Sequence, residues 1–387
     1  MLVVGPEVSP LYGGIAPSFP SIQQAMDVIP LVDNVEKHNF TDRWVILVTP
    51  GYYQEEIHMK PFVTVTGLAP DTVIVQAPPD SSRERSFRGR RATVYMNHHT
   101  SLQNIGVLLR ADSVDGDYGI WNRSTYPSVV GPTGLPNKSD VSNLGVQNVN
   151  IWPAVHPERT SVDDPRGELN PCKAILLEGN FSTVLMTNVG VSYNFTSGYA
   201  VEITGVKHVV KRPGLPDEEQ LSNADTHFIQ CFFDSLFLTP GVAPRPVPAF
   251  GFGGGQTPGG FGFGAGASEP DRYAPFDGGC LRVRDCLEVS IRNSLARVAS
   301  DRDHPRKTGF TNGAALRVEG GAHAIVEGSS LVAPGTAGSD RVLDVEPGSH
   351  CTLYHSSADS VRGGGGVTQR GPLPVDANGV ILDGQVR

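Results

Sequence analysis

The sequence of 387 residues is poor in charge, in aromatic side chains and in long apolar runs. Charged residues make up 18% of the chain, aromatic residues 7%, and the formal net charge is −9. A negative chain is poorly suited to neutralising phosphates, so we expect no nucleic-acid partner. No apolar run is long enough to span a bilayer, so we expect no membrane partner. Residues 1–17 lack a basic stretch followed by an apolar one, and we therefore expect no signal peptide.

The cysteines lack the spacings that indicate a metal site or a disulfide framework. No pair has C-x-x-C spacing and no H-x-x-x-H accompanies them, so we interpret them as small buried residues. The glycine-rich segment GFGGGQTPGG has no flanking strand, helix and lysine of a phosphate-binding loop. The sequence therefore predicts no metal and no cofactor. The cysteines are Cys172, Cys231, Cys280, Cys286 and Cys351.

Glycine and proline are plentiful, at 45 and 31 residues, which is typical of many tight corners and few long helices. Between residues 280 and 360 a pattern occurs three times. Two alternating apolar positions are followed by a corner, three more alternating positions and a small or polar corner residue. The three units contain Leu281, Val283, Leu287, Val289, Ile291 and Asn293; Leu316, Val318, Ala322, Ala324, Val326 and Gly328; Leu343, Val345, Ser349, Cys351, Leu353 and His355.

Alternation of period two predicts half-buried strands, and two strands per recurring unit predict a stacked solenoid. Two earlier segments match the second part of this unit. Phe181, Thr183 and Leu185 align with Leu287, Val289 and Ile291, whereas His227, Ile229 and Cys231 align with Val289, Ile291 and Asn293. No unit can cover its own apolar face, so each must be covered by the next.

Three N-terminal segments carry a resemblance to a known family. SFPSIQQAMDVIP, ILVTPGYYQEEI and VTVTGLAPDTVIV resemble the first coils of pectin-methylesterase-type proteins, within the pectin-lyase-like superfamily. The resemblance covers roughly the first hundred residues and implies an all-β, right-handed, single-stranded parallel β-helix. A helix over 22–29, capped by Ser18 or Ser21, is expected to cover its open N-terminal end.

Composition divides the chain into five parts, with long loop inserts at the corners of the coils. We expect an N-terminal arm and capping helix, β-helix coils with inserts, a Gly/Pro/Phe-rich insert, further coils and an extended C-terminal arm. Their predicted ranges are 1–43, 44–239, 240–279, 280–360 and 361–387.

The residues that such an esterase needs are not found. The resemblance implies two aspartates, glutamines and an arginine in motifs of the form Q-D-T-L, D-F-I-F-G and L-G-R-P-W, and none of these motifs occurs. Asp234 lies in the comparable stretch FIQCFFDSLFL, but a corner aspartate that bonds its own backbone is commoner. The pair Asp163–Asp164 precedes a proline in an insert. We therefore predict no catalytic residues, while a site that converges from separate coils stays open.

The segment 240–279 is dominated by glycine, proline and phenylalanine and cannot bury a core of its own. One interpretation is a surface loop without a function of its own. We favour an arm that orders against a neighbouring subunit, of another kind or of the same chain, because free aromatic side chains on an arm would be adhesive. The predicted assembly contacts are Phe250, Phe252, Phe261 and Phe263.

Together these features predict a non-catalytic structural protein of a virus particle: a capsid-associated, spike or tail component that is made in the host cytoplasm and located in the virion. The link to virions is an analogy drawn from the fold, and the expected lack of a signal peptide, the Gly/Phe-rich arm and the extended termini agree with it. The alternative is a carbohydrate-active enzyme or glycan-binding module of the same superfamily, with a glycan as partner. Its candidate sugar-stacking rings are Trp121, Tyr126, Trp152, Tyr193 and Tyr199.

Overall fold

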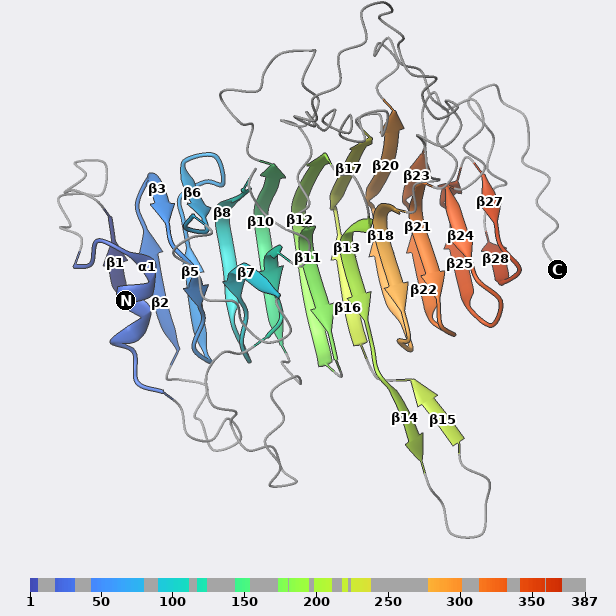
Figure 1. Ribbon diagram of the computed structural model, residues 1–387, viewed down its shortest axis with the longest axis horizontal. Helices are drawn as coiled ribbons and strands as arrows, with labels where there is room; N and C mark the ends of the chain where they lie inside the picture. Colours follow the sequence, from blue (N-terminus) through green and yellow to red (C-terminus); the bar gives the residue numbers. More distant parts are fainter. Residues whose placement is uncertain are drawn as a thin grey trace, which may run out of the picture.

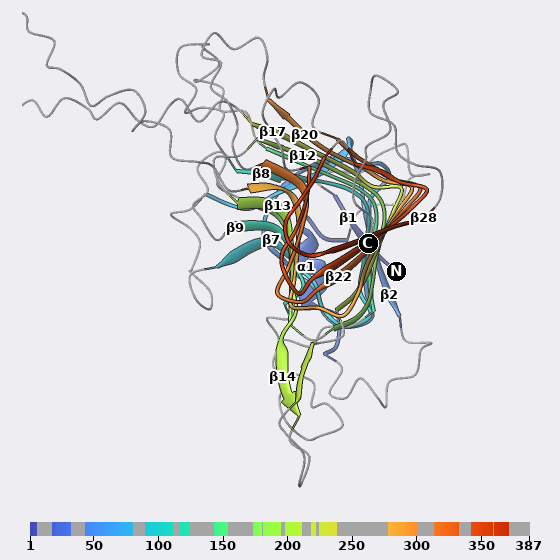
Figure 2. The same cartoon turned by 90° about the vertical axis from the view of Figure 1, so that its right-hand side faces the viewer.

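Short parallel strands wind into coils that stack along one axis, and the chain runs from one end of this column to the other (Figure 1). Figure 2, a view along the column, shows the strands of successive coils lying over one another. The computed structural model describes residues 1–5, 18–31, 43–79, 90–110, 117–123, 143–153, 173–179, 181–194, 198–210, 218–221, 224–237, 278–300, 313–332, 342–358 and 360–370.

One wall of the column is a nine-stranded parallel sheet, in which each strand pairs with the strand of the next coil. In spatial order its strands are β4 (Ile57–His58), β7 (Arg91–Tyr95), β9 (Asp117–Trp121), β11 (Lys173–Glu178), β13 (Gly198–Thr204), β18 (Gly278–Arg284), β21 (Gly313–Glu319), β24 (Leu343–Val345) and β27 (Val361–Arg362).

The rest of the column is a seventeen-stranded sheet with two halves that meet at a corner. The first half contains β1 (Leu2–Val4), β2 (Trp44–Val48), β5 (Val63–Thr66), β16 (Ala224–Ile229), β19 (Val289–Arg292), β22 (His323–Glu327), β25 (His350–Tyr354) and β28 (Gly366–Arg370). The second half contains β3 (Gly51–Gln54), β6 (Val73–Gln76), β17 (Phe232–Phe237), β20 (Leu295–Ser300), β23 (Ser330–Val332) and β26 (Ser357–Ala358). Three longer strands take part in both halves: β8 (Ser101–Leu109), β10 (Leu144–Pro153) and β12 (Phe181–Asn194).

Aliphatic side chains fill the interior and stack in register from coil to coil. Leu281 pairs with Leu316 and Leu316 with Leu343 across the nine-stranded sheet. On the opposite wall Val326 pairs with Leu353, and all five side chains are at most 1% exposed. Burial of one such side chain contributes about 1.5–3 kcal/mol, so these stacked rungs are the main source of stability. The predicted all-β parallel β-helix is confirmed.

The corner between the two halves of the larger sheet is made by residues in the left-handed backbone conformation, which glycine and asparagine tolerate best. Two amide contacts link successive corners: Asn148 Nδ2 donates to Asn104 Oδ1 at 2.8 Å, and Asn188 Nδ2 donates to Asn148 Oδ1 at 2.9 Å. The corners predicted from the repeat are confirmed. The corner residues, with φ from 46° to 55°, are Asn104, Asn148, Asn188, Gln230, Asn293, Gly328 and His355.

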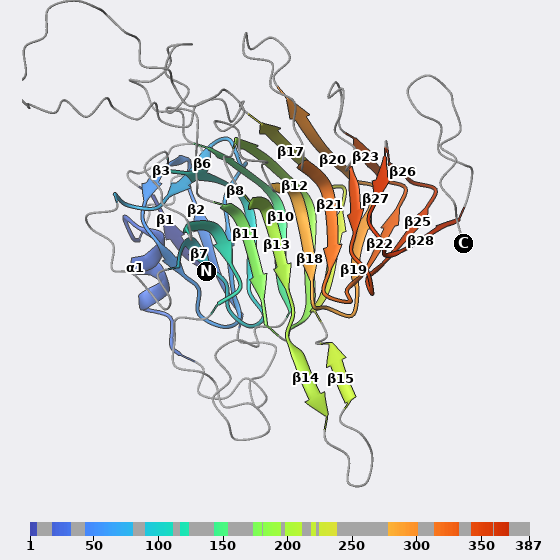
Figure 3. The same cartoon turned by 45° about the vertical axis from the view of Figure 1, so that its right-hand side comes forward.

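Helix α1 (Ile22–Asp27) covers the N-terminal end of the column, as predicted (Figure 3). Ser21 is its N-cap, because its side chain accepts a hydrogen bond from the backbone N–H of Gln24. Glu55, from the coil beneath, accepts from the first helical N–H groups at 2.8 and 2.7 Å. The helix ends two residues earlier than predicted. Its fully buried face consists of Ile22, Ala25 and Met26.

The predicted register is wrong by one residue in β12 and β16. Leu185 was expected inside but is 42% exposed, and Val184 and Met186 occupy the interior instead. In β16 the interior position belongs to Phe228 rather than to His227, which pairs with Ser290. A shift of one residue turns every side chain to the other face of the sheet. Where apolar residues are consecutive, the sequence does not show which of them face the interior.

The repeat alignment also fails at Leu287, which was expected inside and is 52% exposed. Cys286 takes the interior place and is fully buried. The physical reason is the left-handed backbone of Asp285, with φ of 53°, which turns the chain one residue before the expected corner.

A two-stranded antiparallel hairpin of β14 (Lys207–Val210) and β15 (Glu218–Leu221) projects away from the column (Figure 1). Within the described ranges, no helix combines the length and the apolar character needed to cross a bilayer.

Candidate functional site

The outer face of the nine-stranded sheet carries a row of charged side chains. Glu202, Arg282, Arg317 and Asp344 lie side by side on β13, β18, β21 and β24. Each points away from the core because it stands between two buried aliphatic neighbours on its strand. With the charged residues near the ends of these strands they form what we call the outer ladder: Glu202, Arg282, Arg284, Arg317, Glu319, Asp344 and Glu346.

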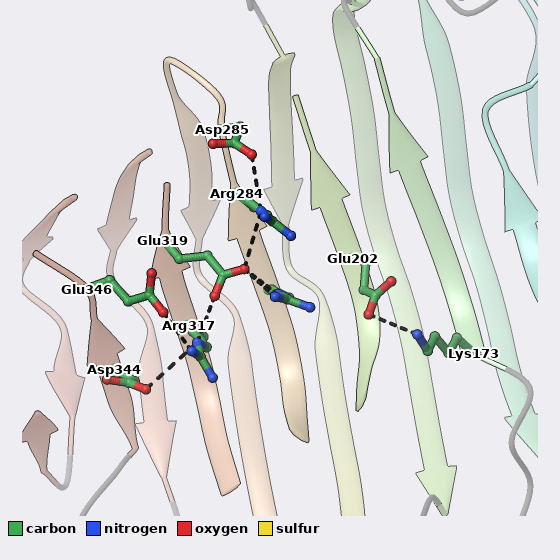
Figure 4. Close-up of polar contacts among 9 residues, drawn as sticks. Lys173, Glu202, Arg284, Asp285, Arg317, Glu319, Asp344 and Glu346 are labelled. Atoms are coloured by element: carbon green, nitrogen blue, oxygen red, sulfur yellow. Dashed lines mark hydrogen bonds and ion pairs between the residues drawn. The ribbon is translucent and has the colours of Figure 1, made fainter. Parts of the chain in front are cut away.

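Glu319 is the centre of the outer ladder (Figure 4). Its residue is only 4% exposed. One carboxylate oxygen accepts from Nε of Arg282 at 2.6 Å and lies 3.7 Å from Nε of Arg284. The other oxygen lies 2.9 Å from Nε of Arg317. One buried carboxylate is thus shared by guanidinium groups from two neighbouring strands: the contact with Arg282 is a charge-assisted hydrogen bond, and those with Arg284 and Arg317 are ion pairs.

Arg317 extends the outer ladder towards the C-terminal end. Its Nη2 donates to Glu346 at 2.6 Å, and its Nε lies 3.9 Å from a carboxylate oxygen of Asp344. Glu202 forms a separate pair with Lys173, at 3.0 Å (Figure 4). Acidic side chains of neighbouring coils therefore do meet on this face, but they meet across arginine or lysine side chains.

Nearer the N-terminal end the same face is aromatic. Tyr95 lies beside Trp121 in register, and together with Tyr118 they belong to a second apolar cluster outside the main core. The ring of His58 stacks on Tyr95 at 4.5 Å between centroids, and Trp121 Nε1 donates to Glu178 at 3.2 Å. All three cluster rings are at most 3% exposed, so none of them offers a surface to a ligand.

The outer ladder is poorly arranged for carboxylate catalysis. Glycoside hydrolysis needs two carboxyl groups that flank a substrate, one of them able to give up a proton. In the outer ladder the oxygens of Glu319 point at three guanidinium groups, and Arg317 stands between Glu319 and the acids of the next coil. Such contacts occupy the lone pairs that a water molecule or a sugar hydroxyl would need. The arrangement holds coils together.

Asp234, the aspartate compared with the family's nucleophile, points outward from β17 and pairs with Arg297 of the next coil. Nε of Arg297 donates to Asp234 Oδ1 at 3.0 Å, and Nη2 donates to the second oxygen. This bidentate contact raises the pKa of Arg297 above its ordinary value. The expected bond to its own backbone is not what holds Asp234. On β12, the neighbouring strand on the other side, the residue paired with Asp234 is Ser192, not a second acid.

The described cysteines are buried, as predicted: Cys231, Cys280, Cys286 and Cys351. Burial raises the pKa of Cys231 to about 11 and the pKa values of Cys286 and Cys351 to about 12. These groups are therefore thiols at neutral pH and poor nucleophiles. Cys172 lies outside the described residues. In the described part of the chain, no group of three or more His, Cys, Asp or Glu side chains is arranged to hold a metal ion.

The other candidates from the sequence divide into buried, half-buried and undescribed residues. Trp121 is fully buried and Tyr199 is 2% exposed, so the expectation that they stack on sugars is wrong. Trp152 is half-buried on β10. Outside the described residues lie Tyr126, the side chain of Tyr193, the pair Asp163–Asp164 and the arm residues Phe250, Phe252, Phe261 and Phe263.

Sequence reasoning missed the outer ladder. Its members come from β13, β18, β21 and β24 and the residues next to them, so no local motif contains them. A signal did exist, because a charged residue stands between the paired apolar residues of each unit: Arg282 in the first, Arg317 in the second and Asp344 in the third. When the three units are aligned, these charged residues fall at the same position of the repeat.

Comparisons with known proteins give weak structural similarity only. No protein-family model and no curated protein matches the sequence. Pectin methylesterase from carrot has 13% identity, covering 92% of this chain and 82% of that chain, with a TM-score of 0.38. Pectin methylesterase PemA from Erwinia chrysanthemi has 10% identity, covering 98% and 83%, with a TM-score of 0.36. The mannuronan C-5 epimerase AlgE6 A-module of Azotobacter vinelandii has 11% identity, covering 91% and 94%, with a TM-score of 0.22.

Proposed function

We propose that the chain is a non-catalytic structural protein whose rigid β-helix is one component of a larger assembly. The observation that carries the proposal is the outer ladder, in which the acids of neighbouring coils are bound by arginines. Side chains that serve as cross-links between coils are consistent with a column built for rigidity. Removing one partner from such a network is destabilising, because the remaining charges lose their counter-charge.

The assembly that we propose is a virus particle, with the chain as a capsid-associated, spike or tail component. This part of the proposal is supported by the fold and by the phenylalanine-rich arm predicted from the sequence. The alternative, a carbohydrate-active enzyme or glycan-binding module, requires a free carboxylate or an exposed ring that the outer ladder and the buried aromatic cluster do not supply.

Two assays test the proposal. In the first, the purified chain is incubated with methyl-esterified pectin, polygalacturonate and a panel of animal and plant glycans, and acid release and reducing ends are followed. We expect no turnover above that of a heat-treated sample. Turnover that disappears in the Asp234→Asn or Glu319→Gln variant, with the fold retained, would favour the enzyme.

In the second assay, an antibody against the chain is used on density-gradient fractions of material from cells that produce it. We expect the chain to migrate with particles of defined density and to stay with them after a salt wash. Recovery only in the free protein fraction would contradict a structural role in a particle.

A further inference from the structure

Two histidines lie side by side on β22 and β25, two strands towards the C-terminal end of the column (Figure 1). His323 of β22 pairs in register with His350 of β25, and their ring centroids are 5.3 Å apart. Each points outward because the next residue on its strand, Ala324 or Cys351, is fully buried in the core. Both histidines are half-buried, so their rings are only partly in contact with water.

Each ring also contacts a threonine of the coil that follows. His323 Nε2 lies 3.1 Å from Oγ1 of Thr352 on β25, and His350 Nε2 lies 3.1 Å from Oγ1 of Thr368 on β28. The other ring nitrogen of His350 lies against Gly366 of β28, since a Cβ atom at that position would be 2.4 Å from Nδ1. The two rings therefore link β22 to β25 and β25 to β28 through side-chain contacts.

Protonation changes these contacts, because each imidazole then carries a positive charge. Histidine is the side chain whose ordinary charge change falls between about pH 5 and 8. Two positive rings with centroids 5.3 Å apart repel each other, and the repulsion is stronger where protein replaces water around them. Acid therefore introduces repulsion at the contact between β22 and β25.

Few charges near the pair offset this repulsion. Glu288, just before β19, favours the charge of His323, but it is exposed. The other charged or titratable residues that point outward from β16, β19, β22, β25 and β28 are Asp225, His227, Arg292, Glu327, Tyr354 and Arg370. The first four form two acid–base pairs, at 2.8 and 3.2 Å, and the guanidinium of Arg370 lies over the tyrosine ring. Among the described residues of this face, Glu288 is thus the acid that remains to balance the histidine charges.

Burial, and then the charge of His350, lower the pKa of His323 below its ordinary value of 6.5, and Glu288 opposes this shift. A histidine with a lowered pKa binds fewer protons in the closed coil than in an opened one, where water surrounds it. The closed state therefore keeps its full stability above about pH 6.5 and loses stability as the pH falls below that value.

We propose that the histidine pair is an acid-sensitive fastening, which keeps β25 and β28 on the column at neutral pH and lets them open when the pH falls. Among the described strands β28 pairs with β25 alone, so fewer contacts hold it than hold a strand with two neighbours. Release of β28 exposes His350 to water, and release of β25 moves the two positive charges apart. This behaviour belongs to the last coils and does not depend on whether the chain is part of a particle.

Hydrogen–deuterium exchange of the full chain, read by mass spectrometry at about pH 7.5 and about pH 5, tests this. Two peptides are compared: residues 350–370, which contain β25 and β28, and residues 198–204 of β13 as the internal reference. Dividing the intrinsic rate by the observed rate at the same pH gives a protection factor that can be compared between conditions. We expect the protection of 350–370 to fall severalfold in acid, whereas that of 198–204 stays the same within error.

The variants are His323→Gln, His350→Gln and, as a matched control, His227→Gln, at a half-buried histidine of the same face. His323→Gln should abolish the severalfold fall. His350→Gln should reduce it, since burial still acts on His323. His227→Gln should leave it unchanged, because Asp225 already balances that ring.

Circular dichroism at neutral pH establishes that each variant is folded, and His350→Gln decides the matter if His323→Gln does not fold. Protection of 350–370 that is equal at the two pH values would overturn the proposal. So would an equal fall in 198–204, a fall that neither variant of the pair reduces, or one that His227→Gln reduces as much as His323→Gln does.

Discussion

Phe232 and Phe233 are consecutive on β17 and offer a matched test of the register of the column. Phe233 is fully buried, and its ring meets that of Phe228 edge-on, with centroids 5.4 Å apart and planes at 86°. Phe232 points outward and is 37% exposed, with the guanidinium of Arg297 5.8 Å from its ring centroid. The same chemical change at the two positions should therefore have very different consequences.

We expect Phe233→Ala to lower the free energy of unfolding by about 3–5 kcal/mol, because it opens a cavity in a packed core. Phe232→Ala should lower it by less than about 1 kcal/mol, the value of an exposed cation–π contact. The measurement is urea-induced unfolding followed by tryptophan fluorescence and circular dichroism. The two variants are compared with the same dependence of the free energy of unfolding on urea concentration. A larger loss for Phe232→Ala would show that β17 has the opposite register, and equal losses would show that the two side chains do not differ in burial. Either result would refute the stacking described above.

Two further predictions concern stability. Burial, and then the charge of His99, lower the pKa of His98 to about 4. Between pH 6.5 and 4 the unfolded chain therefore binds more protons at this residue than the folded chain does. The free energy of unfolding should fall by about 2–3 kcal/mol as the pH drops over this range. Urea midpoints over that range check this, and a His98→Gln variant with the same pH dependence would contradict it. Asn148→Ala should cost about 2–3 kcal/mol, because it removes two amide contacts and leaves a left-handed φ of 50°. Asn148→Gly keeps the backbone freedom and should lose less; an equal loss for both variants in thermal unfolding would show that φ contributes nothing.

The sequence was sufficient for the architecture where apolar and other residues alternate cleanly. Val283, Val318 and Val345 each stand between charged neighbours, so the sequence shows directly that they face inward. The structure pairs them across neighbouring strands. The same holds for the corner at Asn293, where a polar residue that tolerates positive φ ends the strand. Local chemistry determines these features, and a single chain therefore reveals them.

The register was not predictable where several apolar residues are consecutive. Val184, Leu185 and Met186 are all apolar, so the alternation of apolar and polar residues does not show which of them face inward. Their orientation depends on the side chains that the neighbouring coils place in the interior. The outer ladder was hidden for a different reason. Glu319 meets Arg282 only because β18 and β21 are adjacent, and long-range pairing of this kind is a property of the assembled column.

The acids of the outer ladder hold neighbouring coils together, and a comparison of Glu319→Gln with Glu327→Gln measures this role. Glu327 pairs with Arg292 at 3.2 Å, but both side chains are about half exposed, and such pairs contribute about 0–1 kcal/mol. Glu319 is buried, and its removal takes away a charge-assisted hydrogen bond and two ion pairs. Because Arg282 and Arg284 are 31% and 49% exposed and Arg317 keeps its contact with Glu346, we expect a cost of about 1.5–3 kcal/mol. We predict that urea unfolding shows this loss for Glu319→Gln and less than about 1 kcal/mol for Glu327→Gln. Equal stability of the two variants would mean that the buried carboxylate of Glu319 does not hold the coils together.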